Sequence, residues 1–279
     1  MKDWEKQQYS KLVNKVLQEG EKRPSRAGDV YSIFGESLTI DMSTEFPLLR
    51  GRKMFYSGIF GELAAMLRGP RNVSDFKRFG CNYWDAWGKA KRVNDADETI
   101  VEQGELTLDY GNAWLDFNGV NQLDQLVKTL QNNPNDRRML VSAWRPDRLS
   151  DLSLPCCHYS YQWYVRNGKY LDMLWNQRSA DVMVGIPSDI VLAATWNAIL
   201  AAQCGYEPGI IRMVFGDTHI YANHVGPTLD YMRQLRNYHE ATPIEYKIHP
   251  GVTLENFEPG HLEIKNYRPA PAIKFELNV

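Results

Sequence analysis

The sequence has few of the features that mark secreted, metal-binding or membrane proteins. Only 4 of its 279 residues are cysteine, and none follows C-x-x-C or another metal-ligand spacing. The first residues, from Met1 to Lys6, include no apolar core of a signal peptide. No later run approaches the roughly twenty apolar residues that a membrane span needs. These absences argue against a disulfide framework, a bound metal and a membrane anchor, and they predict a cytoplasmic protein.

An excess of either charge is also missing. The chain has 32 basic and 34 acidic residues, a net charge of -2, so no overall field recruits nucleic acid or an anionic membrane. Any phosphate site must therefore be local. Apolar residues, in contrast, are plentiful. They make up 43% of the chain, and 12% of all residues are aromatic, which is enough to bury a substantial core.

Hydrophobic spacing predicts helices and strands along the whole chain. Helices are expected from Trp4 to Gly20, and over 55–67, 123–130, 188–203 and 222–237. Strands are expected over 31–42, 138–144, 158–165, 169–175, 210–215, 261–265 and 273–277. Short helical pieces and then a charged loop over 94–105 are expected between 72 and 111. Asn167-Gly168 predicts a tight hairpin turn, because both residues tolerate a positive φ. Without a repeat or linker, the chain is predicted to form one α+β domain over residues 1–279.

A cysteine stands where a loop can present it to a cleft. Cys157-His158 follows Leu154-Pro155 and lies between two expected strands. A buried structural cysteine is the simpler explanation of such a residue on its own. A basic environment would favour a nucleophile instead, because a guanidinium lowers the pKa of a thiol and also holds a phosphate with two hydrogen bonds. Arg137-Arg138 and residues 177–179 (Gln-Arg-Ser) can supply that environment, although paired arginines are also typical of a solvated face.

Three further features can either bind a ligand or support the fold. Residues 216–224 place two histidines and a tyrosine at an expected strand-to-helix junction, where a capping role for Asp217 is the alternative. Glu62 lies within an apolar helix, as either a buried proton carrier or a surface carboxylate. Trp84 and Trp87 can stack on a flat ring or pack in the core.

The order of several short motifs resembles the thymidylate synthase family. The motifs are residues 32–35 (Ser-Ile-Phe-Gly), 46–49 (Phe-Pro-Leu-Leu), 137–138 (Arg-Arg), 141–144 (Val-Ser-Ala-Trp), 154–158 (Leu-Pro-Cys-Cys-His), 177–181 (Gln-Arg-Ser-Ala-Asp), 185–187 (Gly-Ile-Pro) and 216–221 (Gly-Asp-Thr-His-Ile-Tyr). The similarity extends from about Arg26 to the C-terminal strands. Agreement of several unrelated motifs in order is far more specific than any single short pattern.

This resemblance implies an α+β fold with a large mixed β-sheet flanked by helices, and a homodimer that packs across the sheet face. It implies that Cys157 is the nucleophile that adds to carbon 6 of a pyrimidine, so that carbon 5 becomes electron-rich. Glu62, Tyr110 and His158 match positions in the network that moves protons to and from the base. Carbon 5 then attacks the implied one-carbon donor, methylenetetrahydrofolate. Loss of the carbon 5 proton and of the folate amine leaves an exocyclic methylene.

The binding residues of the family carry over to matching positions of this sequence. Phosphate ligands are expected to be Arg26, Arg178 and Ser179, with Arg137 and Arg138 donated by the other subunit. The deoxyribose hydroxyl is expected to contact His219 and Tyr221, and Gln177, Asp181 and Asp189 complete the expected nucleotide site. The expected folate contacts are Trp84, Trp87, Asp181 and Gly185. The implied partners are a pyrimidine deoxynucleoside monophosphate, a reduced folate and a second copy of the chain, with no metal, nucleic acid or membrane.

One departure from the family bears on the substrate. Thymidylate synthases read the uracil edge with asparagine in a Pro-x-Asn motif, whereas residues 187–189 here are Pro-Ser-Asp. Uracil presents a carbonyl acceptor and a ring N–H donor, and cytosine reverses this pattern with an amine and a bare ring nitrogen. Asp189 can accept from the amine and make the second bond if either it or the ring nitrogen is protonated. An ionised Asp189 would face the uracil carbonyl acceptor to acceptor, which costs about 1–3 kcal/mol.

Aspartate is also the residue that the deoxycytidylate hydroxymethylases carry at this position. The resemblance therefore favours hydroxymethylation of dCMP, in which water quenches the exocyclic methylene and tetrahydrofolate is regenerated. The alternatives are a thymidylate synthase acting on dUMP, in which Asp189 has drifted without a change of substrate, and a dCMP methyltransferase that keeps the hydride step. Further departures are Phe55 in place of a usual histidine, Leu63-Ala64-Ala65 in place of the larger Leu-Leu-Trp, and Cys156 beside the expected nucleophile.

Two alternatives come from other classes of protein. A noncatalytic RNA-binding protein on the same fold is disfavoured by the near-neutral charge and by the presence of Cys157, Arg178 and Glu62. A cysteine hydrolase that uses Cys157 and His158 is disfavoured because neighbouring side chains on an extended segment point apart.

Overall fold

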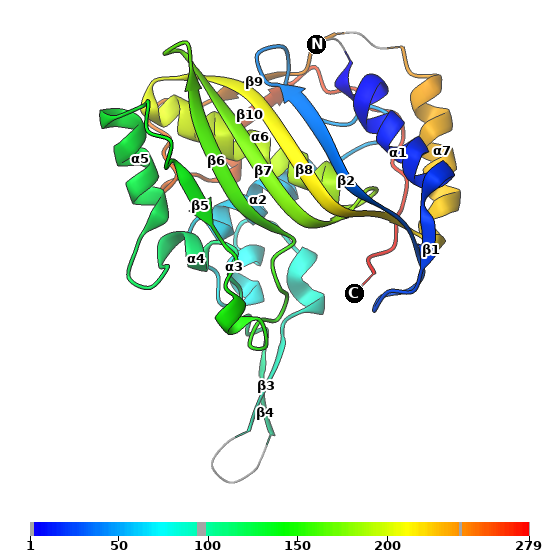
Figure 1. Ribbon diagram of the computed structural model, residues 1–279, viewed down its shortest axis with the longest axis horizontal. Coiled ribbons are helices and arrows are strands. Elements are labelled where there is room, and N and C mark those ends of the chain that lie inside the picture. The colour runs from blue at the N-terminus through cyan, green and yellow to red at the C-terminus, as the bar shows by residue number, and fades with distance from the viewer. Residues whose placement is uncertain (1–2, 94–98, 240–241, 279) are drawn as a thin grey trace.

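The computed structural model describes residues 3–93, 99–239 and 242–278, with the side chains of 89–103 left out. Residues 94–98, the first part of the expected charged loop, therefore lie outside the described residues. Buried apolar side chains from Trp4 to Leu262 form one continuous core. That core lies between a β-sheet and the helices that cover one of its faces (Figure 1).

The sheet has six strands in the order β1-β2-β8-β7-β6-β5. Their bounds are β1 Glu21–Arg23, β2 Val30–Asp41, β5 Leu140–Ser142, β6 His158–Arg166, β7 Tyr170–Asp181 and β8 Glu207–Tyr221. The central pair, β7 and β8, is parallel, and every other neighbouring pair is antiparallel. This arrangement confirms the predicted mixed sheet of an α+β fold.

Two apolar helices cover the back of the sheet in Figure 1: α2 (Tyr56–Met66) and α6 (Gly185–Cys204). Helix α6 is long and apolar enough to cross a membrane by composition alone, but 78% of that stretch is buried inside the protein, which marks it as a core helix. At one side of the sheet lie α1 (Ser10–Glu19), which follows the π-helix η1 (Glu5–Tyr9), and α7 (Val225–Arg236). At the other side lies α5 (Gln122–Asn132).

The remaining elements are short. They are α3 Val73–Lys77, η2 Tyr83–Ala86, β3 Lys89–Val93, β4 Thr99–Gln103, α4 Asn112–Leu115, η3 Pro146–Arg148, η4 Ala222–His224, β9 Glu245–Ile248, η5 Pro259–His261 and β10 Leu262–Lys265. Strands β3 and β4 pair as an antiparallel hairpin that projects from the body of the molecule (Figure 1). Strands β9 and β10 form a second two-stranded sheet.

Local turn chemistry explains the predictions that the structure confirms. Asn167 and Gly168 have φ values of 56° and 64° and lie in the three-residue turn between the paired residues Arg166 of β6 and Tyr170 of β7. Both positions need residues that tolerate a positive φ. Gly20 ends α1 as predicted. A Cβ atom there would lie 2.3 Å from the carbonyl oxygen of Val16, so a larger residue would clash with the last turn.

Other predictions were wrong where long-range pairing decides the outcome. Strand β8 extends over 207–221 rather than 210–215, because β2 and β7 pair with it along most of its length. Residues 273–277 are described but form no strand, because their polar groups bond elsewhere, for example Glu276 O with His224 Nε2 at 2.8 Å. Part of the expected charged loop is the strand β4, and strands β1, β3 and β9 were not predicted.

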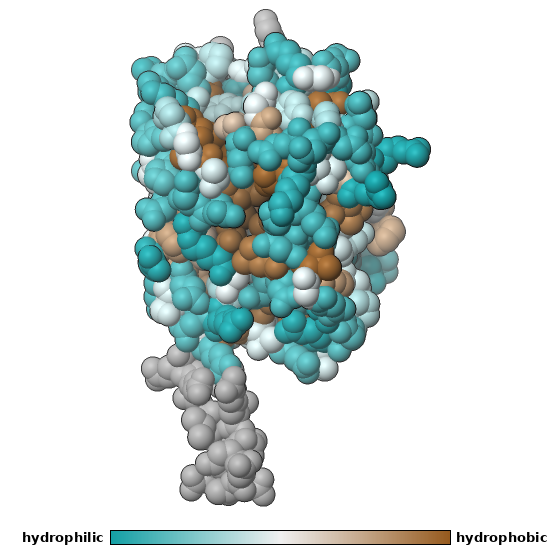
Figure 2. All heavy atoms as spheres, turned by 90° about the vertical axis from the view of Figure 1, so that its left-hand side faces the viewer, coloured by the Kyte–Doolittle hydropathy of each residue, from teal (hydrophilic) through white to brown (hydrophobic). Residues whose placement is uncertain are grey.

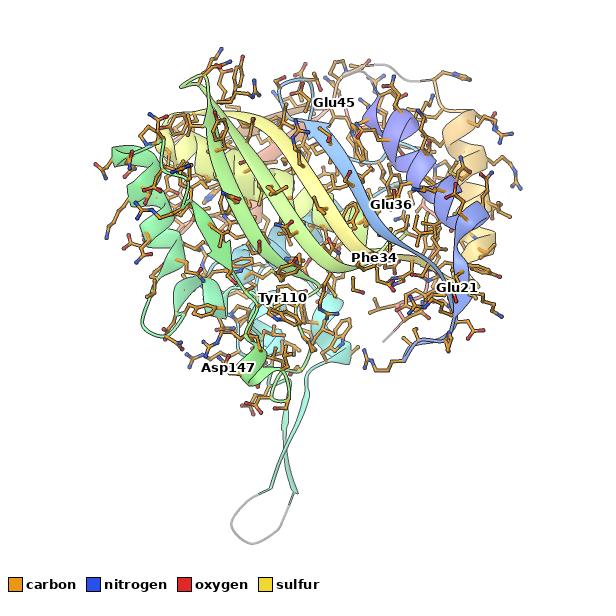
Figure 3. The ribbon with its side chains drawn as sticks, in the orientation of Figure 1. Glu21, Phe34, Glu36, Glu45, Tyr110 and Asp147 are labelled. Atoms are coloured by element: carbon orange, nitrogen blue, oxygen red, sulfur yellow. The ribbon has the colours of Figure 1, made fainter. Side chains whose placement is uncertain are left out.

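The front face of the sheet in Figure 1 carries no helix, and several exposed large apolar residues belong to its strands. Strand pairing places Leu140, Tyr164 and Val214 on this face, with exposed fractions of 47%, 63% and 40%. Phe34 of β2 is 83% exposed (Figure 3). Seen from the side that carries α5, the surface is mostly hydrophilic with apolar side chains in its middle (Figure 2).

Candidate active site

The predicted site residues gather at one edge of the sheet, where β6 begins and β7 and β8 end. Cys157 directly precedes β6, Asp181 ends β7 and Tyr221 ends β8. In the pairing of β7 with β8, Ser179 lies beside Asp217 and Asp181 beside His219. Tyr110 lies on the side from which the β3–β4 hairpin projects (Figure 3). Side chains far apart in the sequence thus meet at one edge.

The loop that carries Cys157 is held from two sides. The Cys157 amide donates to the hydroxyl oxygen of Tyr110, and Arg178 donates through Nε to Cys156 O at 2.7 Å and through Nη2 to Pro155 O at 3.0 Å. Strand β8 passes close beneath, and a Cβ atom on Gly216 would lie 2.7 Å from Arg178 O. Burial raises the pKa of the half-buried Cys157 thiol, and the Arg178 guanidinium opposes that rise. The arginine therefore both shapes the loop and favours the thiolate.

A carboxyl group from α2 stands near this thiol loop. Glu62 accepts a hydrogen bond of 2.9 Å from Trp84 Nε1, and the Trp84 ring lies 5.9 Å from the ring of Tyr110. Burial raises the pKa of Glu62 to about 7, and the bond from Trp84 opposes that rise. A carboxyl that titrates near neutral pH can both accept and return a proton. This supports the proton-carrier role and disfavours the surface alternative.

Asp189 lies on α6, and its contacts come from β6 and β7. Its Oδ2 accepts a hydrogen bond of 2.8 Å from Gln177 Nε2, and its Oδ1 is 3.9 Å from His158 Nε2. Burial raises the pKa of Asp189 to about 8, the bond from Gln177 opposes this, and the charge of Glu62 adds to it. Burial lowers the pKa of His158 to about 3. At neutral pH both groups are therefore uncharged, so the pair is not a salt bridge.

The phosphate and sugar side of the site is polar. His219 Nδ1 donates to Asp217 Oδ1 at 2.8 Å, which leaves Nε2 for another partner. The His219 ring lies 5.2 Å from that of Tyr221. Arg26 is close enough to Tyr221 to lower its pKa, against a larger rise from burial. An anion beside Arg26 and Arg178 would meet two guanidinium groups.

The expected folate residues differ in how accessible they are. Asp181 accepts through Oδ1 from the amides of Met183 and Val184. Its Oδ2 accepts no hydrogen bond from the residues that the structure describes, so it can accept one from a ligand. Gly185 is close to both carboxyl groups: a Cβ atom there would lie 3.5 Å from Asp181 Cβ and 3.8 Å from Asp189 Oδ2. A side chain at this position would fill that space.

Of the two tryptophans expected to contact folate, Trp84 is 4% exposed, and its ring stacks on that of Phe76 with 5.0 Å between the ring centroids. Trp84 therefore packs in the core, which was the alternative role. Trp87 is half-buried and Phe55 is 62% exposed, and these two aromatic side chains offer open surface that fits a flat ring. The folate contacts remain predictions. Among the described residues, no group of three or more His, Cys, Asp or Glu side chains is placed to hold a metal ion.

The paired arginines do not join the rest of the site within one chain. Gln162 Nε2 donates to Arg137 O at 3.3 Å, and Gln162 follows Cys157 by five residues of extended chain, roughly 16 Å. The Arg138 side chain is 88% exposed and is held by Asp136 through two hydrogen bonds of 3.0 and 2.8 Å. Both residues stay near the uncovered sheet face rather than beside Cys157.

Comparison with known proteins agrees with this geometry. The thymidylate synthase family model matches residues 7–279. The chain belongs to the thymidylate synthase family. A relative, the thymidylate synthase of Enterobacteria phage T4, is 36% identical over 235 residues, which are 81% of this chain and 80% of that protein. Members of this family transfer a one-carbon unit from methylenetetrahydrofolate to a pyrimidine nucleotide, and this chain is accordingly a one-carbon transferase.

Two residues of the site were not predicted. Trp175 Nε1 donates to Gln177 Oε1 at 3.3 Å, and the ring of Trp144 lies beneath the Arg178 guanidinium at 5.5 Å. Trp175 and Gln177 are two residues apart on β7 and so share a face of the sheet. This period of two is the sequence signal that links Trp175 with Gln177. Trp144 lies in one of the family motifs, but no role was predicted for either tryptophan.

Proposed function

We propose that this member of the family hydroxymethylates dCMP at carbon 5, with methylenetetrahydrofolate and water as the other reactants. The observation that carries the proposal is the buried carboxyl of Asp189 at the position where the family reads the base. A neutral carboxyl offers one O–H donor and one acceptor oxygen. These match the ring nitrogen and the exocyclic amine of cytosine.

Cytosine has a second advantage over uracil at such a carboxyl. Its ring nitrogen is far more basic than the carbonyl oxygen of uracil, so it is the stronger acceptor for the O–H of the neutral carboxyl. In a buried site such a difference between two acceptors counts for more than it does in water. Asp189 therefore favours cytosine without excluding uracil altogether.

The water step fits the carboxyl on α2. Glu62 titrates near neutral pH, so it can take the proton of a water molecule whose oxygen bonds to the exocyclic methylene. The electron pair that returns to carbon 5 expels the Cys157 thiolate from carbon 6, which frees 5-hydroxymethyl-dCMP; tetrahydrofolate has already left when the exocyclic methylene forms. Phe55 stands in place of the usual histidine, and Ala64 and Ala65 are smaller than the usual residues of the family. In this proposal the three differences change the shape of the pocket that holds the water molecule. A cytoplasmic location, where nucleotide and folate are available, is part of this proposal.

One assay tests the reaction directly. The wild-type protein is incubated with dCMP or dUMP and methylenetetrahydrofolate, and the nucleotide and folate products are identified by mass. We expect a much higher kcat/KM for dCMP, with a product that carries a hydroxymethyl group, and tetrahydrofolate. Methylated dCMP with dihydrofolate would mean that the hydride step is kept. Thymidylate from a preferred dUMP would refute the proposal.

We also propose that the chain acts as a homodimer packed across the uncovered sheet face. Exposed Leu140, Tyr164 and Val214 on that face are an apolar surface that a second copy would bury. Arg138 lies near the same face, held by Asp136 and away from Cys157 of its own chain. It is therefore placed to reach the phosphate in the site of the partner subunit.

Subunit complementation checks this arrangement. Cys157→Ser and Arg138→Ala should each be nearly inactive, but after subunit exchange each mixed dimer contains one intact site. Random mixing then restores about a quarter of the wild-type activity. The matched control mixes Cys157→Ser with Glu62→Gln, which damages the same half of the site in both chains and should restore nothing. If verified exchange restores no activity in the first mixture, Arg138 does not act across the interface.

A further inference from the structure

Gln177 links a core tryptophan to the base-reading carboxyl. Its Oε1 accepts a 3.3 Å hydrogen bond from Trp175 Nε1, and its Nε2 donates to Ser179 O at 3.0 Å and to Asp189 Oδ2 at 2.8 Å. An indole nitrogen can only donate. A flipped amide would set Nε2 against that donor and Oε1 against the carbonyl oxygen of Ser179, so two bonds would be lost together whatever the protonation of Asp189. The orientation of the amide is therefore determined.

The two oxygens of Asp189 consequently differ. Oδ2 receives the Gln177 N–H and is held as an acceptor. Among the described residues, Oδ1 has no partner within hydrogen-bond distance, and His158 Nε2 stands 3.9 Å away. In a neutral carboxyl the carbonyl oxygen is the better acceptor and the hydroxyl oxygen the donor. The proton therefore belongs on Oδ1.

The location of this proton matters because a neutral carboxyl can in principle pair with either base. With the hydroxyl opposite the ring nitrogen it fits cytosine, and with the hydroxyl opposite the substituent at carbon 4 it fits uracil. A carboxyl free to move its proton between the two oxygens would read both. Holding the proton on one oxygen makes the reading selective, because the wrong base then meets donor to donor and acceptor to acceptor.

We infer that Gln177 sets the base preference of this enzyme by holding Oδ2 of Asp189 as an acceptor and so keeping the carboxyl proton on Oδ1. Gln177 is thus a positioning residue, and Trp175 fixes it in turn. The inference rests on the proposed base-reading role of Asp189. It goes beyond the choice of aspartate itself, since the same aspartate without this amide would discriminate poorly.

The other groups around Asp189 do not perform this task. Glu62 of α2 and Asp181 of β7 raise its pKa through their charges, and Cys157 and Tyr161 lie close enough for Asp189 to raise theirs. His158 is neutral at physiological pH. Burial, with a smaller part from the charges of Glu62 and Asp181, raises the pKa of Asp189 to about 8, but among the described residues only Gln177 distinguishes one oxygen from the other by a hydrogen bond.

The test compares binding of dCMP and dUMP without folate, by calorimetry, so that turnover is not needed. Gln177→Met keeps an unbranched side chain of similar length and removes the donor. We expect the ratio of the two dissociation constants to move toward equality by about tenfold. The alkaline loss of dCMP binding should also move to higher pH, because the lost hydrogen bond stabilised the ionised carboxyl. Replacing a residue that only supports the fold would not shift the pH at which dCMP binding is lost.

Gln122→Met is the matched control. The side chain of Gln122 also makes three hydrogen bonds, to Ala113 O at 2.7 Å, to Ser142 O at 2.8 Å and from the Ser142 amide at 2.9 Å, and neither of these partners belongs to the proposed base site. This variant should keep the wild-type ratio. Trp175→Phe frees the Gln177 amide to flip, so it should shift the ratio of the two dissociation constants in the same direction as Gln177→Met. It replaces Gln177→Met in the test if the Gln177→Met protein does not fold.

An unchanged ratio in Gln177→Met, with both nucleotides still bound, would overturn the inference. The same holds if Gln122→Met changes the ratio equally. Failure of the proposed function looks different: if the wild type prefers dUMP, the dCMP proposal fails, yet Gln177→Met should still bring that preference toward equality. The two results are thus separable.

Discussion

Replacement of Cys157 by serine or alanine is expected to lower turnover by at least about a thousandfold while nucleotide binding largely survives. The proposed mechanism separates bond formation from binding. In it the sulfur forms the bond to carbon 6 that makes carbon 5 a nucleophile, whereas Arg26, Arg178 and the sugar-side residues are expected to hold the nucleotide. Steady-state kinetics and calorimetry on the same preparations measure the two effects.

Cys156 provides the control for this substitution. It is 1% exposed, and its Sγ lies 3.8 Å from Ala143 O, on the core side of the loop, where burial raises its pKa far above the usual range. Cys156→Ser should therefore keep most of the wild-type turnover. Substantial turnover in Cys157→Ser, lost only when Cys156 is also replaced, would assign the nucleophile to the neighbouring residue.

The second large effect is expected from Asp189→Asn. Asparagine has about the same size, but its amide N–H is a weaker donor to the cytosine ring nitrogen than a carboxyl O–H. With its oxygen held by Gln177 Nε2, the amide keeps the donor and acceptor positions of the neutral carboxyl, so dCMP loses strength in one hydrogen bond rather than the pattern of bonds. We expect the ratio of kcat/KM for dCMP to that for dUMP to fall by about tenfold. Parallel assays with both nucleotides give this ratio.

The pH dependence distinguishes the loss of a titrating group from a general change in fit. Asp189 is neutral below its pKa of about 8 and ionised above it, and only the neutral form donates to the base. In the wild type, kcat/KM for dCMP should therefore fall as the pH rises through about 8. The Asp189→Asn variant should lose the part of this fall in kcat/KM that comes from Asp189. The titrations of Glu62 and Cys157 remain in both proteins. Equal pH profiles and an unchanged substrate ratio would remove Asp189 from base reading.

Much of the site was predictable because its residues lie in short motifs. The nucleophile loop, the end of β7 and the end of β8 each place two or three functional side chains within a few consecutive residues, and family resemblance assigned them together. Cooperation between distant residues was less predictable. The bond from Trp84 to Glu62 joins η2 to α2, and the chain from Trp175 through Gln177 to Asp189 joins β7 to α6. No local pattern in the sequence encodes either contact.

Local sequence by itself determined features that depend on one residue's own conformational freedom or on periodic burial. Asn167-Gly168 closes the β6–β7 hairpin because both residues accept positive φ, and the continuous apolar stretch after Pro187 produced the buried helix α6. Only the tertiary structure decided that Asp189 and Glu62 titrate near neutral pH, that Arg138 stands apart from its own Cys157, and that residues 273–277 remain unpaired. A pKa depends on the water removed by distant segments, and a strand depends on a partner with a free edge. Both conditions arise only when the whole chain has packed.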